Sequence, residues 1–425
     1  MRRLHVWWDD RRVGELTQDE HGDLGFTYSP DYLQRADGRP LSRSLPKREG
    51  TFTRRECRPF FGGLLPEEGA RDAVASVLGV SRANDFSLLD SLGGDVAGAL
   101  QLLPDGVRPR EPFPTRDDGP SSTSPLDDDG LSAVLDALPK RPFLVGDGGL
   151  RLSLAGAQPK LPVVLVNDAV ALPAQGEPTT HILKPPITRF AATTENEAFV
   201  MRLAVACGLD VARVEARVVH GRSFLLVERY DRIIDSGHTQ RIHQEDFCQA
   251  LGVPPERKYA REKGPTFRDC FALVRAATRK PADALLRLLD AAIFNVIAGN
   301  ADAHGKNFSL LYAEGGTRLA PLYDLLMTVA YPELSPGFAM KVGKKATLAE
   351  LDEAAWRAFA EEGGLGFPLV RRRVWELCEA VAVQAESVAV ALMALGLDAA
   401  HLAAFADAAR ARAERCALGL KSPGR

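Results

Sequence analysis

The stretch Gly299-Asn300-Ala301-Asp302-Ala303-His304-Gly305-Lys306-Asn307-Phe308 carries more information than any other part of this sequence. It places a carboxylate, an imidazole and an amide within six residues, after an apolar pattern that predicts a helix over 285–297. A carboxylate on such a loop can accept the proton of an attacking hydroxyl, and a nearby amide oxygen can hold a magnesium ion. Asp, Asn, Gly and His are also ordinary turn residues, so the motif needs support from the rest of the chain.

Two further features give this loop a specific chemistry. Asp302 and Asn307 are five positions apart, which is the spacing of the aspartate and asparagine in a protein-kinase catalytic loop. A second acid, Asp324, follows the apolar segment 319–323, which is expected to be a short strand that delivers it. Phosphoryl transfer to a hydroxyl requires one base and two metal-binding positions. The sequence therefore predicts a site for this reaction around Asp302, Asn307 and Asp324.

The overall composition is that of an ordinary soluble globular protein. At 425 residues the chain is too long for one hydrophobic core, so two or three domains are expected. The net charge of −3 gives no support for a globally basic nucleic-acid binder, although abundant arginine leaves room for a local basic patch. Six scattered cysteines without a CxxC pair predict reduced, buried thiols. Neither a signal peptide nor a membrane span is expected, which predicts a cytoplasmic protein without a membrane partner.

Local composition divides the chain into four expected segments. Residues 1–103 predict a small mixed domain that opens with a strand, a turn and a strand over 4–16. Residues 104–130 are rich in Pro, Asp, Ser and Thr, so a surface linker or a disordered segment is expected. Residues 236–425 are helical in pattern. Between them, residues 131–235 predict a helix over 194–207 and strands over 150–154, 161–166, 181–184, 214–219 and 223–228.

The order of these segments predicts the fold class. A β-rich lobe followed by a helical lobe is the order of the two-lobed protein kinases. We therefore expect an α+β, protein-kinase-like two-lobe fold. It would have a β-rich N-terminal lobe, an added small N-terminal subdomain and an all-helical C-terminal lobe.

The segment 153–160, Ser-Leu-Ala-Gly-Ala-Gln-Pro-Lys, joins two predicted strands and contains mostly small residues. Small side chains let the backbone approach a ligand, and free backbone amides could hold phosphate oxygens. The segment contains one glycine, whereas a usual glycine-rich loop contains several. The alternative is a β-turn with Lys160 facing solvent.

Other candidate nucleotide contacts lie at strand ends. Lys184 follows a short apolar strand, as does the kinase lysine that pairs with the α- and β-phosphates. Glu197 on the next helix could orient that lysine, and Glu195 is an alternative. Residues 228–231 end the β-rich part, where a hinge could present its backbone to an adenine ring and Asp231 could reach the ribose. Each of these features also has a purely structural explanation. Lys184 could be an exposed lysine at a strand end, the two glutamates could simply suit the N-terminal end of the helix dipole, and residues 228–231 could be an exposed salt-bridged cluster.

Several short motifs, taken in order along the chain, together resemble one family, the HipA serine/threonine kinases. These are toxins of bacterial type II toxin–antitoxin modules. Each motif alone is weak, but their conjunction is specific, and the helical tail agrees in character. They are Gly63-Leu-Leu-Pro-Glu67, Gly94-Asp-Val-Ala-Gly-Ala99, Ser153-Leu-Ala-Gly-Ala-Gln158, Leu183-Lys-Pro185, Asn196-Glu197, Val227-Glu-Arg-Tyr-Asp-Arg232, His243-Gln-Glu-Asp-Phe-Cys-Gln249, Asp302-Ala-His-Gly-Lys-Asn307 and Leu322-Tyr-Asp324.

The resemblance implies a set of roles for the site residues. Asp302 looks like the catalytic base, Asn307 and Asp324 look like magnesium ligands, and ATP with Mg²⁺ is implied. Ser153 is similar to the serine that these kinases autophosphorylate, which in the family ejects the phosphate loop and switches the enzyme off. A phosphate there adds about −1.5 to −2 charge and would repel ATP. The implied nucleotide-binding residues are Ala155, Gly156, Ala157, Gln158, Lys160, Lys184, Glu197, Glu228, Arg229, Tyr230, Asp231, His304 and Lys306.

The resemblance also implies partners. A small HipB-like helix-turn-helix antitoxin would hold the toxin inactive, and operator DNA would be bound mainly through that antitoxin. The implied substrate is a protein, an aminoacyl-tRNA synthetase in studied members. The chain departs from the family pattern at Pro159, where a charged residue is usual, at Tyr230, where phenylalanine is frequent, and in its long 104–130 linker. None of these departures removes a chemical group that the mechanism needs.

Two other functions stay open. Small-molecule kinases of the aminoglycoside-phosphotransferase type share the two-lobe fold and the Asp, Asn, Asp set. Their acceptor pocket is typically acidic, and no further cluster of acids is visible in this sequence. A non-enzymatic scaffold that serves as co-repressor with its antitoxin is the other alternative. Loss of Asp302, Asn307 or Asp324 would be its signature, and all three are present.

Overall fold

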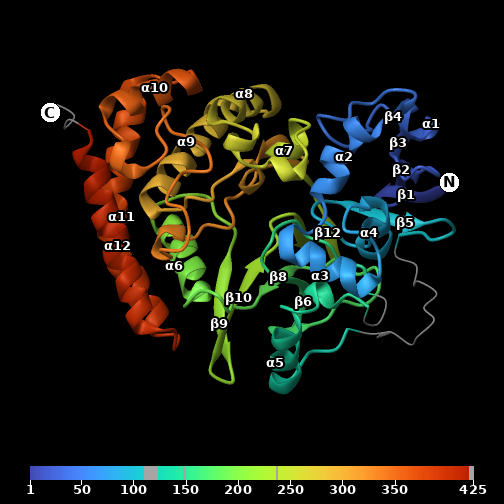
Figure 1. Ribbon diagram of the computed structural model, residues 1–425, viewed down its shortest axis with the longest axis horizontal. Helices are drawn as coiled ribbons and strands as arrows, with labels where there is room; N and C mark the ends of the chain where they lie inside the picture. Colours follow the sequence, from blue (N-terminus) through green and yellow to red (C-terminus); the bar gives the residue numbers. More distant parts are fainter. Residues whose placement is uncertain (110–122, 147–149, 236–237, 421–425) are drawn as a thin grey trace. The chain divides into compact units, whose positions relative to one another are not determined.

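The computed structural model describes residues 1–109, 123–146, 150–235 and 238–420 (Figure 1). The chain forms two compact units, unit 1 (Met1–Pro185 with Leu226–Pro255) and unit 2 (Pro186–Leu225 with Glu256–Arg425). These units do not follow the boundaries expected from composition, because residues 1–103 and the first strands of the β-rich segment lie together in unit 1. The middle of the expected linker, 110–122, lies outside the described residues, and its last residues begin helix α5 (Asp128–Ala137).

Unit 1 opens with an antiparallel sheet of order β4-β3-β2-β1-β5. The predicted strand, turn and strand at the N-terminus are confirmed as β1 and β2. Alternate residues such as Leu4, Val6 and Phe26 are buried, so one face of the sheet forms a core, and helix α2 packs against β3. The elements are β1 (Arg2–Trp8), β2 (Arg11–Gln18), β3 (Leu24–Tyr28), α1 (Pro30–Gln34), β4 (Thr51–Phe52), α2 (Arg54–Gly63), α3 (Glu68–Leu78), α4 (Asp85–Leu92) and β5 (Leu100–Pro104).

The second sheet of unit 1 contains the strands expected around the phosphate loop. Strand β7 pairs with β6, and β6 pairs with β8. Strand β10 runs from unit 2 into unit 1. The predicted strand over 150–154 is wrong, because only Leu152 pairs there, in an isolated bridge with Asp95. The strands of this sheet described so far are β6 (Leu161–Val166), β7 (Ala169–Ala171), β8 (His181–Lys184) and β10 (Arg222–Glu228). Outside it, β11 (Arg232–Asp235) and β12 (His238–Arg241) form a two-stranded antiparallel sheet, and β13 (His243–Asp246) and α7 (Phe247–Ala250) follow.

A buried ion cluster ties the N-terminal region to the strands of unit 1. Arg232 and Arg241 each donate to Asp95 Oδ1 at 2.9 Å, and Arg229 donates to Asp95 Oδ2 at 3.1 Å. Arg229 also binds Asp231 through two hydrogen bonds of 3.0 and 2.9 Å. Burial alone would raise the pKa of Asp95, but the three guanidinium groups outweigh it and hold the pKa well below its usual range. The cluster explains why region 1–103 and the strand segment share one compact unit.

His243 is a second buried polar link within unit 1. Its Nε2 lies 2.8 Å from the carbonyl oxygen of Leu41, and its ring centroid lies 4.4 Å from that of Trp8. Burial lowers the pKa of His243 from its ordinary 6.5 to about 4, although the hydrogen bond to Leu41 acts in the opposite direction. The ring is therefore neutral in the folded chain at neutral pH.

We expect this histidine to make unit 1 acid-sensitive. Because the unfolded chain binds the proton at a higher pH than the folded chain, the free energy of unfolding falls as the pH drops from 6.5 to about 4. The total loss is on the order of 3 kcal/mol. A His243→Gln variant should lack this component, and hydrogen-exchange protection of unit 1 at pH 7 and pH 5 measures it. An equal pH dependence in wild type and variant would contradict the assignment.

Unit 2 is mainly helical, with α9 at its centre. Helix α9 is apolar along most of its length and packs against α8, α11 and α12, while α11 and α12 run side by side (Figure 1). The predicted helices over 194–207 and 285–297 are confirmed as α6 and α9. The elements are α6 (Thr193–Ala206), β9 (Val214–Val219), α8 (Phe267–Ala277), α9 (Pro281–Ala298), β14 (Ser309–Ala313), β15 (Gly316–Leu319), α10 (Glu353–Gly363), α11 (Phe367–Met393) and α12 (Ala399–Leu418).

The α+β class is confirmed, with one correction to the expected second lobe. That lobe is not all-helical, because β14 and β15 form an antiparallel hairpin directly after the catalytic motif. The short apolar segment before Asp324 contributes a single bridge, from Leu322 to Val211, rather than a full strand. No helix in the described part of the chain is long and apolar enough to span a membrane. Short 3₁₀ turns are η1 (Pro142–Leu144), η2 (Pro255–Arg257), η3 (Ala260–Glu262), η4 (Gly305–Asn307), η5 (Thr328–Ala330) and η6 (Leu348–Glu350).

Candidate functional site

The candidate catalytic loop begins where α9 ends, at Gly299. This glycine has φ 78°, and a Cβ atom at this position would lie 2.4 Å from Val329 Cγ2, so only glycine fits. Thr328 holds the next residues, because its Oγ1 accepts the N–H of Ala301 at 2.8 Å and donates to the carbonyl of Gly299 at 3.1 Å. The loop is therefore fixed at its start by a helix cap and by a segment further along unit 2.

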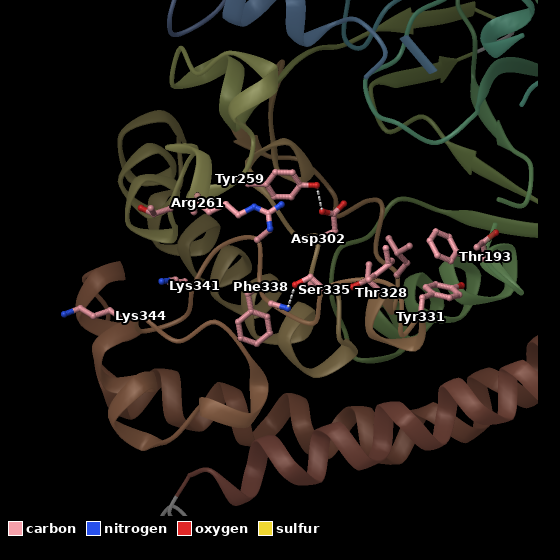
Figure 2. A pocket seen from close by; sticks show the side chains of 18 of the residues that line it. Thr193, Tyr259, Arg261, Asp302, Thr328, Tyr331, Ser335, Phe338, Lys341 and Lys344 are labelled. Carbon is pink, nitrogen blue, oxygen red and sulfur yellow. Dashed lines mark hydrogen bonds between the residues drawn. The ribbon is translucent and has the colours of Figure 1, made fainter. Parts of the chain in front are cut away.

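Asp302 projects from this fixed backbone and is exposed, whereas Ala301 and Ala303 beside it are buried. Its backbone N–H donates to Asn300 Oδ1 at 3.2 Å. The hydroxyl of Tyr259 donates to Asp302 Oδ1 at 2.8 Å, which orients the carboxylate (Figure 2). An oriented, exposed carboxylate is the arrangement that a general base needs in order to receive a proton from an incoming hydroxyl.

The two predicted metal ligands lie together in unit 2. Asn307 Nδ2 donates to Asp324 Oδ2 at 3.2 Å, and Asn307 Oδ1 accepts the N–H of His304 at 3.1 Å. Asp324 has φ 58°, a strained conformation that aspartate tolerates better than most residues. Carboxylate and amide oxygens suit Mg²⁺, and each carbonyl oxygen has a second lone pair. The two side chains therefore fit a magnesium ion.

The number of ligands also fits magnesium. Among the residues that the structure describes, no group of three or more His, Cys, Asp and Glu side chains could hold a metal ion. Mg²⁺ usually takes only one or two protein carboxylates and completes its shell with water and substrate phosphates. A pair such as Asn307 and Asp324 is consistent with that mode of binding.

His304 and Lys306, two candidate nucleotide contacts, lie on the same loop and are mostly buried. The turn η4 is closed by a hydrogen bond of 3.0 Å from the N–H of Asn307 to the carbonyl of His304. The hydroxyl of Tyr323 donates to the carbonyl of Lys306 at 2.6 Å. The structure thus brings Asp302, the metal pair and these two residues into one loop cluster of unit 2.

Helix α6 places Glu197 in unit 2, with its side chain 3% exposed. The neighbouring Asn196 fixes the helix to the segment after Asp324, because its amide exchanges hydrogen bonds of 3.1 and 2.7 Å with the backbone of Met327. Lys184, at the end of β8, is also buried but belongs to unit 1. The pairing of Lys184 with Glu197 stays a prediction.

The phosphate-loop candidate lies in unit 1 and packs against the region after α2. Ser153 is fully buried, its Oγ donates to the carbonyl of Leu64 at 2.8 Å, and its N–H donates to the carbonyl of Asp95 at 3.0 Å. Gly156 has φ 111°, and its carbonyl accepts the N–H of Glu67 at 3.1 Å. Residues Ala155, Gly156 and Gln158 are partly exposed and Ala157 is exposed, as a ligand-contacting loop requires.

Lys160 does not face solvent, which removes the alternative of an ordinary turn with an exposed lysine. It is 8% exposed, and its Nζ donates to the carbonyl of Ala155 at 2.8 Å across the loop. A Cβ atom on Gly156 would lie 2.6 Å from this Nζ, so the glycine permits the lysine to fold inward. The ammonium group of Lys160 therefore stabilises the candidate phosphate loop by a hydrogen bond across it.

The charged residues of the hinge candidate are buried. Both carboxylate oxygens of Asp231 accept hydrogen bonds inside the buried ion cluster, including one of 2.7 Å from the N–H of Gly98. Arg229 is held in the same cluster, so the reading as an exposed salt-bridged cluster is wrong, and the contact of Asp231 with a ribose stays a prediction. Glu228 and Tyr230 are partly exposed and remain the proposed hinge.

Sequence reasoning missed the residues that hold the catalytic loop in place. Asn300 Nδ2 donates to Asn295 Oδ1 at 2.9 Å, and Asn295 Nδ2 donates to the carbonyl of Ala291 within α9. An asparagine on the apolar face of a predicted helix was a visible signal for Asn295. Tyr259 and Thr328 gave none, because they lie 43 and 26 residues from Asp302 outside any motif.

Comparisons with known proteins identify the family of this chain. Two family models match the chain, the HipA N-terminal domain over residues 4–103 and the HipA-like C-terminal domain over residues 152–389. The protein Y4mE of Sinorhizobium fredii is 60% identical over 421 residues, which are 99% of this chain and 100% of that protein. The serine/threonine-protein kinase toxin HipA of Shewanella oneidensis is 33% identical over 381 residues, which are 86% of this chain and 84% of that protein.

A solved structure extends the agreement to three dimensions. HipA of Shewanella oneidensis, in a complex with HipB and its operator DNA, matches with a TM-score of 0.83. The sequence identity is 30%, and the match covers 97% of both chains. The second matched family model alone covers more than half of this chain, including the catalytic loop and both metal-ligand candidates. This chain therefore belongs to the HipA family of kinases.

Proposed function

We propose that this chain is a HipA-like serine/threonine-protein kinase toxin that transfers the γ-phosphate of Mg-ATP to a serine of a protein. An aminoacyl-tRNA synthetase is the substrate that the family resemblance suggests. The observation that carries the proposal is the loop cluster of unit 2, where Asp302 is oriented by Tyr259 and Asn307 contacts Asp324. The base and one metal ligand lie on one loop, and the hydrogen bond from Asn307 joins the second ligand, Asp324, to it, so the groups that phosphoryl transfer requires are held close together.

In the proposed reaction, the acceptor hydroxyl oxygen forms a bond to the γ-phosphorus while the bond to the β–γ bridging oxygen breaks. The hydroxyl proton passes to the Asp302 carboxylate, and ADP leaves. A Mg²⁺ ion held by Asn307 and Asp324 would neutralise charge on the phosphate oxygens. Tyr259 holds the carboxylate of Asp302 in one orientation through its hydrogen bond to Oδ1. Lys184, Lys160 and the backbone of 155–158 are the proposed phosphate contacts.

We propose that phosphorylation of Ser153 switches the enzyme off. The buried Ser153 hydroxyl donates to the carbonyl of Leu64, so a phosphate cannot be accommodated there while the loop stays packed. A doubly charged group in such a buried position costs several kcal/mol unless it is paired. The modified loop would therefore leave its place, and the nucleotide would lose its phosphate contacts.

The proposed protein partner is a HipB-like antitoxin. The HipA relative from Shewanella oneidensis has been solved in a complex with HipB and its operator DNA, and the match covers 97% of this chain. We propose that an antitoxin of this type neutralises the present kinase and that DNA is reached mainly through it.

The alternative of a kinase for cationic small molecules finds no support at Asp302. The cavity beside this residue is lined by Arg261, Arg268, Lys341 and Lys344, and Glu362 is its other acid. A cationic lining would repel an aminoglycoside. A pure co-repressor scaffold is equally unsupported, because the hydrogen bonds that hold Asp302, Asn307 and Asp324 serve no purpose in it.

Autophosphorylation provides the test. Purified protein incubated with Mg-ATP should gain one phosphate, located at Ser153 by intact mass and peptide mapping, and EDTA should abolish the gain. Ser153→Ala should lose it, whereas a control, Ser387→Ala, changes an exposed serine of α11 and should keep it. A phosphate found elsewhere would contradict the Ser153 assignment. Absence of ATP-dependent transfer to Ser153 and to any added protein would contradict the kinase itself.

A further inference from the structure

The proposed mechanism uses Asp302 but gives no role to the large cavity beside it. This cavity lies within unit 2, measures about 920 Å³ and has Asp302 in its wall (Figure 2). Its lining comes mainly from residues 187–193, 259–268 and 326–344. A volume of this size accommodates a ligand far larger than one serine side chain. Because an acceptor hydroxyl must reach Asp302, the cavity is where the rest of the acceptor would lie.

One side of the cavity is cationic. Arg261, Arg268, Lys341 and Lys344 line it and are all exposed, although the whole chain has a net charge of −3. Among the described residues, Arg268, Lys341 and Lys344 form no ion pair and no side-chain hydrogen bond. Arg261 lies over the Tyr259 ring at 4.9 Å and reaches only the exposed Glu262, at 3.8 Å. Among the described residues, three of these charges therefore have no partner and the one charged partner of Arg261 is exposed, so all four are available to an anionic ligand.

The opposite side is aromatic and apolar. Figure 2 shows Thr193 and Tyr331 on one side of Asp302, and Arg261, Lys341 and Lys344 on the other. The rings of Tyr331 and Phe190 lie 4.9 Å apart, and Ile187, Leu326 and Leu334 add apolar surface. The Tyr331 hydroxyl is already bonded to the carbonyl of Ala191 at 3.1 Å, so this side offers mainly apolar contact.

We propose that this cavity binds the acceptor polypeptide and selects a serine or threonine flanked by acidic residues on one side and by an apolar or aromatic residue on the other. The acidic residues face Arg261, Arg268, Lys341 and Lys344, and the apolar residue packs against the paired rings of Phe190 and Tyr331. This inference rests on the proposed kinase function and names its substrate class. Exposed cations give specificity and faster association more than affinity, which suits a transient kinase substrate.

The two-sided lining favours a polypeptide over a nucleic acid. Phosphate groups would use the cations, but the apolar wall with Ile187, Leu326 and Leu334 offers no counterpart to a charged backbone. A cationic small molecule would be repelled. An acidic peptide with an apolar residue uses both walls and places its hydroxyl at Asp302 between them.

Matched peptides test the proposal. Each would carry the same serine with a leucine on one side of it, and three glutamates or three lysines on the other side. The ratio of kcat/KM values for acidic and basic peptides should be about fivefold to twentyfold in the wild type, as expected for a few exposed ion pairs. The Lys341→Glu/Lys344→Glu variant should lose or invert this preference, mainly through KM. The Lys280→Glu/Arg318→Glu variant is the control, because it makes the same charge change outside the cavity.

Binding is measured separately, by fluorescence anisotropy of the labelled peptides with the Asp302→Asn variant. If the acidic peptides bound more tightly but the wild type transferred no phosphate to any peptide, the acceptor site would be supported and the kinase function would be contradicted. Transfer with equal kcat/KM for acidic and basic peptides, or an unchanged preference in Lys341→Glu/Lys344→Glu, would overturn the acceptor site alone. If that variant lost affinity for transfer RNA but kept its peptide preference, the cations would belong to a nucleic-acid site and the proposal would fall.

Discussion

Replacement of Asp302 by asparagine is expected to lower kcat for phosphate transfer by about 10²–10⁴-fold, the usual contribution of a positioned general base. Asparagine has the same shape, and its Oδ1 can still accept the hydrogen bond that Tyr259 donates. The loop should therefore keep its conformation, because Ala301 and Gly299 are held by Thr328 rather than by the carboxylate. The variant would lose only the ability to accept the hydroxyl proton. Quenched-flow measurement of transfer to an acceptor peptide gives the rate.

The Tyr259→Phe variant is the matched control for this prediction. It leaves the carboxylate but removes the hydroxyl that orients it, so a smaller loss of kcat is expected, on the order of 10-fold for one hydrogen bond to a charged group. Affinity for ATP should change little in either variant. If Asp302→Asn reduced the rate no more than Tyr259→Phe does, Asp302 would not be the base.

The catalytic loop was predictable from the sequence because its chemistry is local. Asp302 and Asn307 lie five residues apart, and the apolar pattern before them predicts the helix, α9, on which the loop is mounted. Asp324 follows only 17 residues after Asn307. Strands β6, β8 and β9 were predicted at their observed bounds because each is a short segment rich in β-branched or other apolar residues that is followed by turn residues.

The residues that hold the site depend on contacts that no local pattern records. Tyr259 reaches Asp302 from 43 positions away, and nothing in its neighbourhood marks it as a partner. Arg229 and Asp231 also depend on a distant residue, which is why their burial could not be predicted from the sequence. Their charges at a strand end indicated a surface or a ligand site, but Asp95 lies 134 residues before Arg229 and supplies the missing countercharge. Burial of a charge can be read from sequence only when its partner is known.

Asp95→Asn is expected to destabilise unit 1 by about 3–5 kcal/mol, the usual effect of removing one partner from a buried ion network. Asp95 is 2% exposed, and its two oxygens hold Arg232, Arg241 and Arg229, as well as the Thr179 hydroxyl at 2.6 Å. The neutral variant would leave three buried guanidinium groups with one carboxylate, that of Asp231, which pairs with Arg229 and Arg232. Because unit 1 contains both the N-terminal region and the strand segment, loss of this link should loosen both together.

Hydrogen exchange measured by mass spectrometry tests this prediction for each unit, because a two-unit chain need not unfold in one step. Peptides from β5 and from residues 229–235 should lose protection in Asp95→Asn, whereas α9 and α11 should keep theirs. The control is Asp37→Asn, which removes a carboxylate of the same unit that also binds two arginines, Arg11 and Arg35, but at the exposed surface. Surface pairs contribute little, so its protection should match the wild type. Equal effects of the two variants would mean that the buried cluster does not join the N-terminal region to the strands.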